Sequence, residues 1–214
     1  MGLLSNTLRM GASQPSAADT AYQIEKSLRF NSGDTAYLNS NLGSKGNTRV
    51  WTWSGWVKRN KLGVNQAVFT GGEGSDGNDR DGLMFLSDDV LTVYWRSGGT
   101  TQEQLKTSQV FRDVGSWMHV VWSFDYNNSG TSATDKSKLY INGKLVTAWD
   151  TTFSASVTPK INESGNAFWI GKQPAADPAD IQLADVQFID GLALSPAAFG
   201  ESSSAGAWDP KALA

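Results

Sequence analysis

The chain contains no cysteine and only one histidine, His119, among its 214 residues. Without cysteine it has no disulfide framework, no thiol nucleophile and no thiolate metal site. A single histidine cannot supply the two or three imidazoles that zinc sites commonly use. We therefore assign no catalytic residue and no metal-ligating residue from these two residue types.

Long apolar runs and basic clusters are also missing. The apolar runs are too short to span a membrane, and 18 basic against 21 acidic residues disfavour nucleic-acid binding. The opening MGLLSNTLRMGA lacks the core and cleavage site of a signal peptide, and Asn6 stands where a myristoylation motif needs Ser or Thr. We expect no nucleic-acid partner, no membrane insertion and no export by the ordinary secretory route.

Aromatic residues are abundant instead, with nine Trp, nine Phe and five Tyr. From Tyr22 onward, apolar and polar residues alternate in short segments separated by turn-forming residues, which is typical of β-strands. The strands predicted in this way are 27–30, 35–38, 50–58, 66–70, 83–87, 90–96, 117–125, 138–141, 144–149, 168–171 and 181–189. Short strands at this spacing, without long amphipathic helices, predict an all-β sandwich or barrel.

The segment 117–125 shows the clearest alternation. One face carries Met118, Val120, Trp122 and Phe124, and the other carries Trp117, His119, Val121, Ser123 and Asp125. No nucleophile or orienting acid accompanies His119, so we interpret it as a packed side chain with one satisfied nitrogen rather than a general base. The Trp residues within strands, namely Trp53, Trp56, Trp117 and Trp122, are predicted to fill the core.

Two local signals mark turns. Asn142-Gly143, between two apolar segments, predicts a hairpin with a type I′ turn. Ser195-Pro196 predicts an N-cap followed by proline at the first position of a short helix.

The two ends of the chain differ from its centre. Residues 1–23 are predicted to form an extended arm and linker, residues 24–200 the sandwich and residues 201–214 a tail. The arm carries Leu3, Leu4, Leu8 and Met10, and it is either a frayed terminus or an anchor that orders on a partner. Trp208 has no predicted strand around it, and we expect it to plug a groove on this or a neighbouring subunit.

Four segments, taken together and in order, resemble a laminin-G-like, concanavalin A-like jelly-roll domain. They are WTWSGWVKR (51–59), GSWMHVVWSFD (115–125), KLYINGKLV (138–146) and LADVQFIDGLALSPAAF (183–199). The resemblance covers roughly residues 26–200, and it implies a sandwich of two antiparallel sheets preceded by the extended N-terminal arm. It does not by itself imply a function.

A narrower resemblance is to virion proteins of tailed bacteriophages, especially marine and cyanobacterial phages. It is carried by SLRFNSGDTAYLN (27–39), WTWSGWVKR, DVQFIDGLALSP and the opening MGLLSNTLRMGA. The resemblance implies a virion protein, assembled in the host bacterial cytoplasm, that binds other virion proteins through its arm. Its expected role is a tail-fibre or receptor-binding module that contacts host surface glycans, and the alternative is a capsid decoration protein. A homo-oligomer is expected because a single sandwich gains avidity only in several copies.

The expected site for a glycan is the rim loops, where recognition in a sandwich usually lies. We assign Asp76, Asp79, Trp95 and Trp149 as candidate glycan-binding residues, although packing inside the protein is the favoured role of Trp95, Trp149 and Trp169. The Asp-rich loop is interpreted as a solvent-exposed turn, since Gly and Asp are common turn residues. The alternative is a calcium site, because laminin-G-like domains can hold calcium at the rim of the sandwich. The paired carboxylates of the fold's glucanases are absent, so no enzymatic activity is expected.

Overall fold

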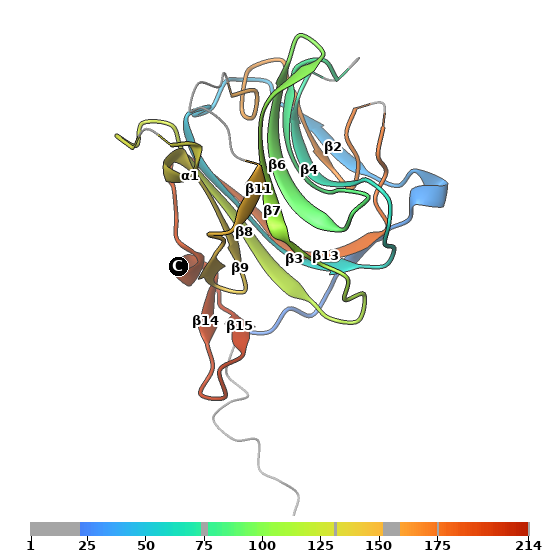
Figure 1. Cartoon of the computed structure of the whole chain (residues 1–214), viewed down its shortest axis with the longest axis vertical. Coiled ribbons are helices and arrows are strands. Elements are labelled where there is room, and N and C mark those ends of the chain that lie inside the picture. The colour runs from blue at the N-terminus through green and yellow to red at the C-terminus, as the bar shows by residue number, and fades with distance from the viewer. Residues whose placement is uncertain (1–21, 74–76, 131, 152–158, 175, 214) are drawn as a thin grey trace, which may run out of the picture.

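The structure is a computed structural model that describes residues 22–73, 77–130, 132–151, 159–174 and 176–213. Two large antiparallel sheets pack face to face, and a two-stranded hairpin extends beyond one end of them (Figure 1). The predicted all-β sandwich of two antiparallel sheets is therefore confirmed. The predicted arm falls mostly on residues 1–21, which lie outside the described residues, and the domain boundaries stay a prediction.

The six-stranded sheet has the order β1-β13-β3-β8-β9-β10. Its strands are β1 (Leu28–Phe30), β3 (Val50–Arg59), β8 (Met118–Asp125), β9 (Ser137–Ile141), β10 (Lys144–Leu145) and β13 (Ile181–Asp190). The two strongest sequence signals, around residues 50–58 and 117–125, become the adjacent strands β3 and β8 near the centre of this sheet.

The seven-stranded sheet has the order β11-β7-β6-β5-β4-β12-β2. Its strands are β2 (Leu38–Asn41), β4 (Gln66–Gly72), β5 (Arg80–Phe85), β6 (Val90–Ser97), β7 (Thr100–Val110), β11 (Trp149–Thr151) and β12 (Ala167–Ile170). The predicted strand 144–149 is wrong as one element, because the chain leaves β10 and then joins the opposite sheet as β11.

Short elements complete the fold. A 3₁₀ turn, η2 (Ser32–Asp34), precedes the predicted strand 35–38, of which only Leu38 belongs to β2. A helical turn, α1 (Ala133–Lys136), lies in the loop after β8. The predicted helical turn at Ser195-Pro196 is confirmed as the 3₁₀ turn η3 (Pro196–Ala198). Strands β14 (Gly200–Ser202) and β15 (Trp208–Pro210) form the projecting hairpin. Asn142 and Gly143 both have positive φ, as the predicted type I′ turn requires.

The core lies between the two sheets and is built from aromatic rings. Met118, Val120, Trp122 and Phe124 all belong to it, which confirms the predicted inner face of β8. From β3, Trp51 and Trp53 enter the same cluster. Buried aromatic rings remove large apolar areas from water, so they stabilise this fold without disulfide bonds.

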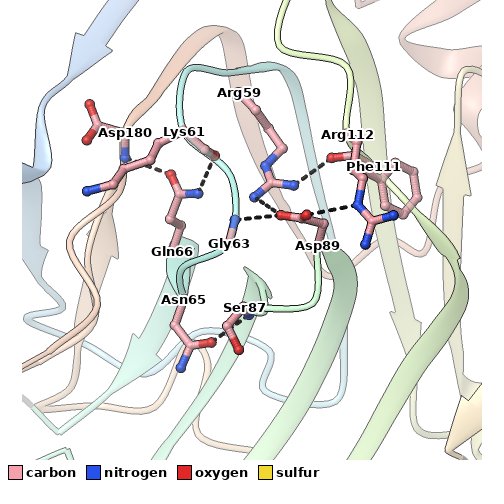
Figure 2. Close-up of polar contacts among 10 residues, drawn as sticks. All are labelled: Arg59, Lys61, Gly63, Asn65, Gln66, Ser87, Asp89, Phe111, Arg112 and Asp180. Atoms are coloured by element: carbon pink, nitrogen blue, oxygen red, sulfur yellow. Dashed lines mark hydrogen bonds and ion pairs between the residues drawn. The ribbon is translucent and has the colours of Figure 1, made fainter.

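A buried ion pair closes one end of the sandwich (Figure 2). The guanidinium of Arg59, which is fully buried, lies 3.1 Å from Asp89 Oδ1 and donates to the carbonyl of Phe111. Asp89 also accepts hydrogen bonds from the Gly63 amide and from Arg112. These donors, first the Gly63 amide, hold the pKa of Asp89 below its ordinary value and keep the carboxylate charged.

The segment after β13 covers the outer face of the six-stranded sheet. Thr52 Oγ1 donates to the Leu192 carbonyl and accepts from the Leu194 amide, both at 2.8 Å. The hairpin β14–β15 follows this segment and lies beside the same sheet (Figure 1). The outer face of β3 and β8 is therefore partly closed by the chain's own C-terminal part.

Candidate functional site

A groove with a volume of about 710 Å³ lies on the outer side of the six-stranded sheet. Its walls come from residues 22–27, from β3 and β13, from Trp117 just before β8, and from β15. The side chains that give it its chemical character are Tyr22, Glu25, Trp56, Trp117, Gln182 and Asp209. Aromatic walls with a few polar groups are the usual composition of a small-molecule site.

Strand periodicity places the two Trp residues of the groove. On β3, Thr52, Ser54 and Trp56 alternate with the core residues Trp51, Trp53 and Val57. Trp117 precedes β8, on the side opposite the core residue Met118. Trp53 and Trp122 are core residues as predicted. Trp56 is buried as predicted, with 8% of it exposed, but it lies on the outer face and not in the cluster between the sheets. The prediction that Trp117 fills the core is corrected, because it is half-buried on the outer face.

His119 lies directly behind the groove wall formed by Trp56. Its ring stacks on the Trp56 ring, with centroids 5.1 Å apart, and only 1% of the residue is exposed. Ser54 Oγ lies 2.8 Å from Nε2, and Trp208 Nε1 donates to Nδ1 at 3.0 Å. The packed role is confirmed, but both ring nitrogens, not one, have a partner. Burial lowers the pKa of His119 to about 4.

Trp208 packs against its own chain. Its ring lies parallel to that of His119 at a centroid distance of 6.1 Å. A Cβ atom at Gly143 would come within 2.4 Å of the indole, and one at Gly200 within 2.6 Å. Trp208 therefore fills a slot that needs glycine on both sides, within this subunit. The other predicted anchoring residues, Leu3, Leu4, Leu8 and Met10, lie outside the described residues.

The candidate glycan residues of the rim are not gathered into a site by the described part of the chain. Trp95 is 1% exposed and stacks within the core near Trp122 and Phe124, so its proposed stacking on a sugar is corrected to core packing. Trp149 is half-buried on β11, beside the core. Asp79 accepts from Ser97 Oγ and pairs with Lys160. Asp76 lies outside the described residues.

The remaining carboxylates of the Asp-rich region each have a separate environment. Asp81 is fully buried, its Oδ2 accepts from the amides of Lys160 and Ile161, and burial raises its pKa to about 8. Asp88 pairs with Lys106. Within the ranges that the structure describes, no three His, Cys, Asp or Glu side chains are grouped so that they could hold a metal ion. Because Asp76 is not described, calcium stays a prediction.

The sequence did not reveal most of the groove. Glu25, Gln182 and Asp209 come from segments far apart in the chain, and they meet only through the sheet order β13-β3-β8 and the position of β15. One sequence feature could have located part of the groove: the alternation in β3 and β8 puts Trp56 and His119 on the same outer face. The structure places these two residues opposite each other in the β3–β8 ladder. Among the described helices, none has the length and apolar character needed to cross a bilayer.

Residues 31–198 match the family model of the concanavalin A-like lectin/glucanases superfamily. No curated protein matches the chain by sequence.

Two solved structures show the same architecture. Domains LG4-5 of the mouse laminin α1 chain give a TM-score of 0.55 at 8% identity, covering 91% of this chain and 46% of that one. Domain 4 of AbnA, a GH43 extracellular arabinanase from Geobacillus stearothermophilus in complex with arabinotriose, gives 0.54 at 21% identity, covering 75% and 69%. At these identities the likeness concerns the fold alone.

Proposed function

The chain belongs to the concanavalin A-like lectin/glucanases superfamily, and from this premise we propose that it is a non-enzymatic glycan-binding protein. The ligand lies in the outer groove, between Trp56 and Trp117. The observation that carries the proposal is the composition of that groove, two indoles and a tyrosine beside carboxylate and amide groups. Indole faces pack against the C–H faces of sugar rings, and carboxylates and amides accept or donate hydrogen bonds to hydroxyls.

One solved relative of the fold supports this proposal by analogy. Domain 4 of the arabinanase was solved in complex with arabinotriose, so a sandwich of this architecture can form a complex with an oligosaccharide. The analogy concerns the class of ligand and not the identity of the sugar.

The proposed absence of catalysis rests on the exposure of the groove's carboxylates. Glu25 and Asp209 are both exposed to solvent. A glycosidase needs a general acid whose pKa is raised by burial or by a close like charge, facing a second carboxylate. We expect no turnover of any oligosaccharide that binds. Hydrolysis that disappears in Glu25→Gln or Asp209→Asn would contradict this part of the proposal.

The binding test compares two tryptophans of similar partial burial. A glycan array first identifies a bound oligosaccharide, and calorimetry then measures its affinity for the wild type, Trp117→Ala and Trp149→Ala. We expect Trp117→Ala to weaken binding by about 10-fold or more, which corresponds to about 1.4 kcal/mol. Trp149→Ala, outside the groove, serves as the control and should bind as the wild type does. Equal affinities of all three proteins would contradict the groove.

We further propose that the biological setting is a tailed-phage virion, where the protein acts as a tail-fibre or receptor-binding module. The support is the resemblance carried by residues 27–39, 51–59 and 185–196. Immunogold labelling of intact particles tests it: a few dozen copies on the tail are expected, whereas hundreds on the head would indicate capsid decoration. Deleting residues 1–20 should leave the sandwich folded but stop incorporation into particles, and a truncated chain that cannot fold would contradict an anchoring arm.

A further inference from the structure

Three aromatic rings in sequence link the groove to the C-terminal hairpin. The ring of His119 stacks on Trp56 at a centroid distance of 5.1 Å, and its edge accepts the indole N–H of Trp208, whose ring lies at 6.1 Å with an interplanar angle of 19°. Trp56 is a wall of the groove, and the residues directly after Trp208, Asp209 and Pro210, line it too. The hairpin β14–β15 therefore carries one side of the groove and is fastened to the sheet next to His119.

The hydrogen bonds of His119 define one tautomer. An indole N–H can only donate, so the bond from Trp208 Nε1 requires an unprotonated Nδ1. The proton of the neutral ring must then lie on Nε2, which donates to Ser54 Oγ. A second proton could enter only at Nδ1, where it would point at the indole N–H. Protonation would thus replace a hydrogen bond with two opposed donors.

The slot around Trp208 leaves it little room to adapt. Gly143 and Gly200 lie against the indole ring so closely that a Cβ at either would overlap it. Phe199 closes the slot beyond His119, with ring centroids 6.3 Å apart. Because the indole cannot shift sideways within this slot, loss of its bond to His119 favours movement of the hairpin as a whole.

We propose that His119 and Trp208 form an acid-sensitive latch, and that its opening removes the hairpin wall from the groove. Closed at neutral pH, the latch keeps Asp209 and Pro210 at the ligand. Opened by a proton on His119, it releases β14–β15 and weakens ligand binding. The ligand part of this inference rests on the proposed function of the groove, but the latch itself does not.

Among the described residues, the side chains in direct contact with His119 carry no acidic or basic group. Ser54 and Trp56 face it from β3, Asn142 from the turn after β9, Phe199 from the residue before β14, and Trp208 from β15. The charged side chains on these strands, on β8 itself and on the turn strand β10 are Lys58, Arg59, Asp125, Lys138, Lys144, Glu201 and Asp209. Burial, rather than any of these charges, lowers the pKa of His119, and burial also raises that of Tyr140 on β9.

The sign of the pH effect follows from the two states of the latch. In the closed state the pKa of His119 is about 4, and in the open, solvated state it returns toward the ordinary 6.5. The open state therefore binds more protons between these values, and acidification favours it. Above about pH 6.5 the opening constant of the latch no longer depends on the charge of His119. It rises by about 150-fold as the pH falls to about 4, toward a limit of about 300-fold below both pKa values.

The first experiment follows the hairpin without any ligand. Hydrogen exchange of the full chain at pH 7.5, 6.5, 5.5 and 4.5, corrected for intrinsic rates, is compared between β14–β15 and β3–β8. We expect the hairpin to lose protection below pH 6.5 while the central strands keep theirs. A hairpin that stays protected until the central strands unfold would overturn the latch.

Three variants separate the latch from general acid sensitivity. His119→Gln can accept from Trp208 and donate to Ser54 but cannot titrate, so its hairpin should stay protected at pH 4.5. Trp208→Phe keeps a ring in the slot but loses the donor, so its hairpin should open at a higher pH than the wild type. Gly200→Ala should open it at every pH. If His119→Gln does not fold, an unchanged midpoint in Trp208→Phe alone overturns the proposal.

Ligand affinity then separates the latch from the proposed function. With an oligosaccharide that binds at pH 7.5, the affinity should fall in parallel with hairpin protection in the wild type and stay constant in His119→Gln. If the ligand affinity stays constant while the hairpin loses protection, the hairpin's role as a groove wall is overturned. If no oligosaccharide binds at any pH while the hairpin still opens in acid, the proposed function fails and the latch stands.

Discussion

The two faces of strands β3 and β8 use the same residue type for different purposes. On the inner face, Trp51 and Trp122 meet edge to face, with centroids 4.7 Å apart, and both are fully buried. On the outer face, Trp56 contacts a histidine, and Trp117 borders the groove. The inner rings contact buried or partly buried residues of the same domain, so we expect them to determine stability. The outer rings face groups that can move or leave, so we expect them to determine binding.

The largest stability effect should come from the inner face. Trp122→Ala removes a fully buried indole that contacts Trp51 and Trp95 and donates to Ser137 Oγ. We expect a loss of about 4 kcal/mol in the free energy of unfolding, since large core truncations leave a cavity. Denaturant unfolding followed by circular dichroism measures it. A loss below about 1 kcal/mol would contradict the contrast between the faces.

The charged end of the core offers a second way to weaken the inner side. Asp89→Asn keeps the side-chain shape and tolerates the positive φ of residue 89, but it leaves Arg59 buried without a carboxylate. We expect a loss of about 3 kcal/mol in the free energy of unfolding. The neighbouring Asp88→Asn, which breaks the exposed pair with Lys106, is the matched control and should cost under about 0.5 kcal/mol. Equal effects of the two variants would show that burial does not matter here.

On the outer face, the strongest stability effect should involve a hydroxyl rather than an indole. Thr52→Val keeps the shape of the side chain but leaves the Leu192 carbonyl and the Leu194 amide without their partner. We expect a loss of about 2 kcal/mol, since two part-buried hydrogen bonds are lost and each contributes about 1 kcal/mol. Chemical denaturation gives the loss, and hydrogen exchange should show it concentrated in residues 192–194. Unchanged exchange there would show that the hydroxyl does not hold this segment.

Of the two tryptophan truncations, Trp117→Ala should have the smaller stability effect. Because Trp117 is only half-buried and borders the groove, its removal should cost under about 1 kcal/mol in the free energy of unfolding. The same variant is the one expected to lose glycan binding. A thermal shift as large as that of Trp122→Ala would show that the outer face also carries the fold.

The contrast between the faces was only partly predictable from the sequence. Alternation in 117–125 gave both faces of β8 correctly, because the period of a strand is two and every inner residue is apolar. The alternation does not show which segments pack against the outer face. Trp56 is buried on that face, whereas Trp117, also assigned to the core, borders the groove. Strand β7 was not predicted at all, because its sequence TTQEQLKTSQV is almost entirely polar and Leu105 is its only fully buried apolar residue.

The binding residues were harder to predict for a different reason. Trp95 looked like a strand-end residue, but β6 continues past it to Ser97, and its ring lies in the core. Glu25 and Asp209, near opposite ends of the chain, meet only because the sheet brings their segments to one groove. Composition and local pattern predict the elements, whereas a site assembled from distant segments needs the topology.

The order of strands in the six-stranded sheet also sets the timing of folding. Strand β3 pairs on one side with β8 and on the other with β13, so Trp53 lies opposite Phe188 with most of the chain between them. Such non-local pairing is slow, because the loop must close before the contacts are gained. During synthesis, β3 cannot complete its ladder until β13 has left the ribosome. An interrupted chain would therefore present an aromatic strand with an open edge, which makes prompt completion of synthesis the main protection against aggregation.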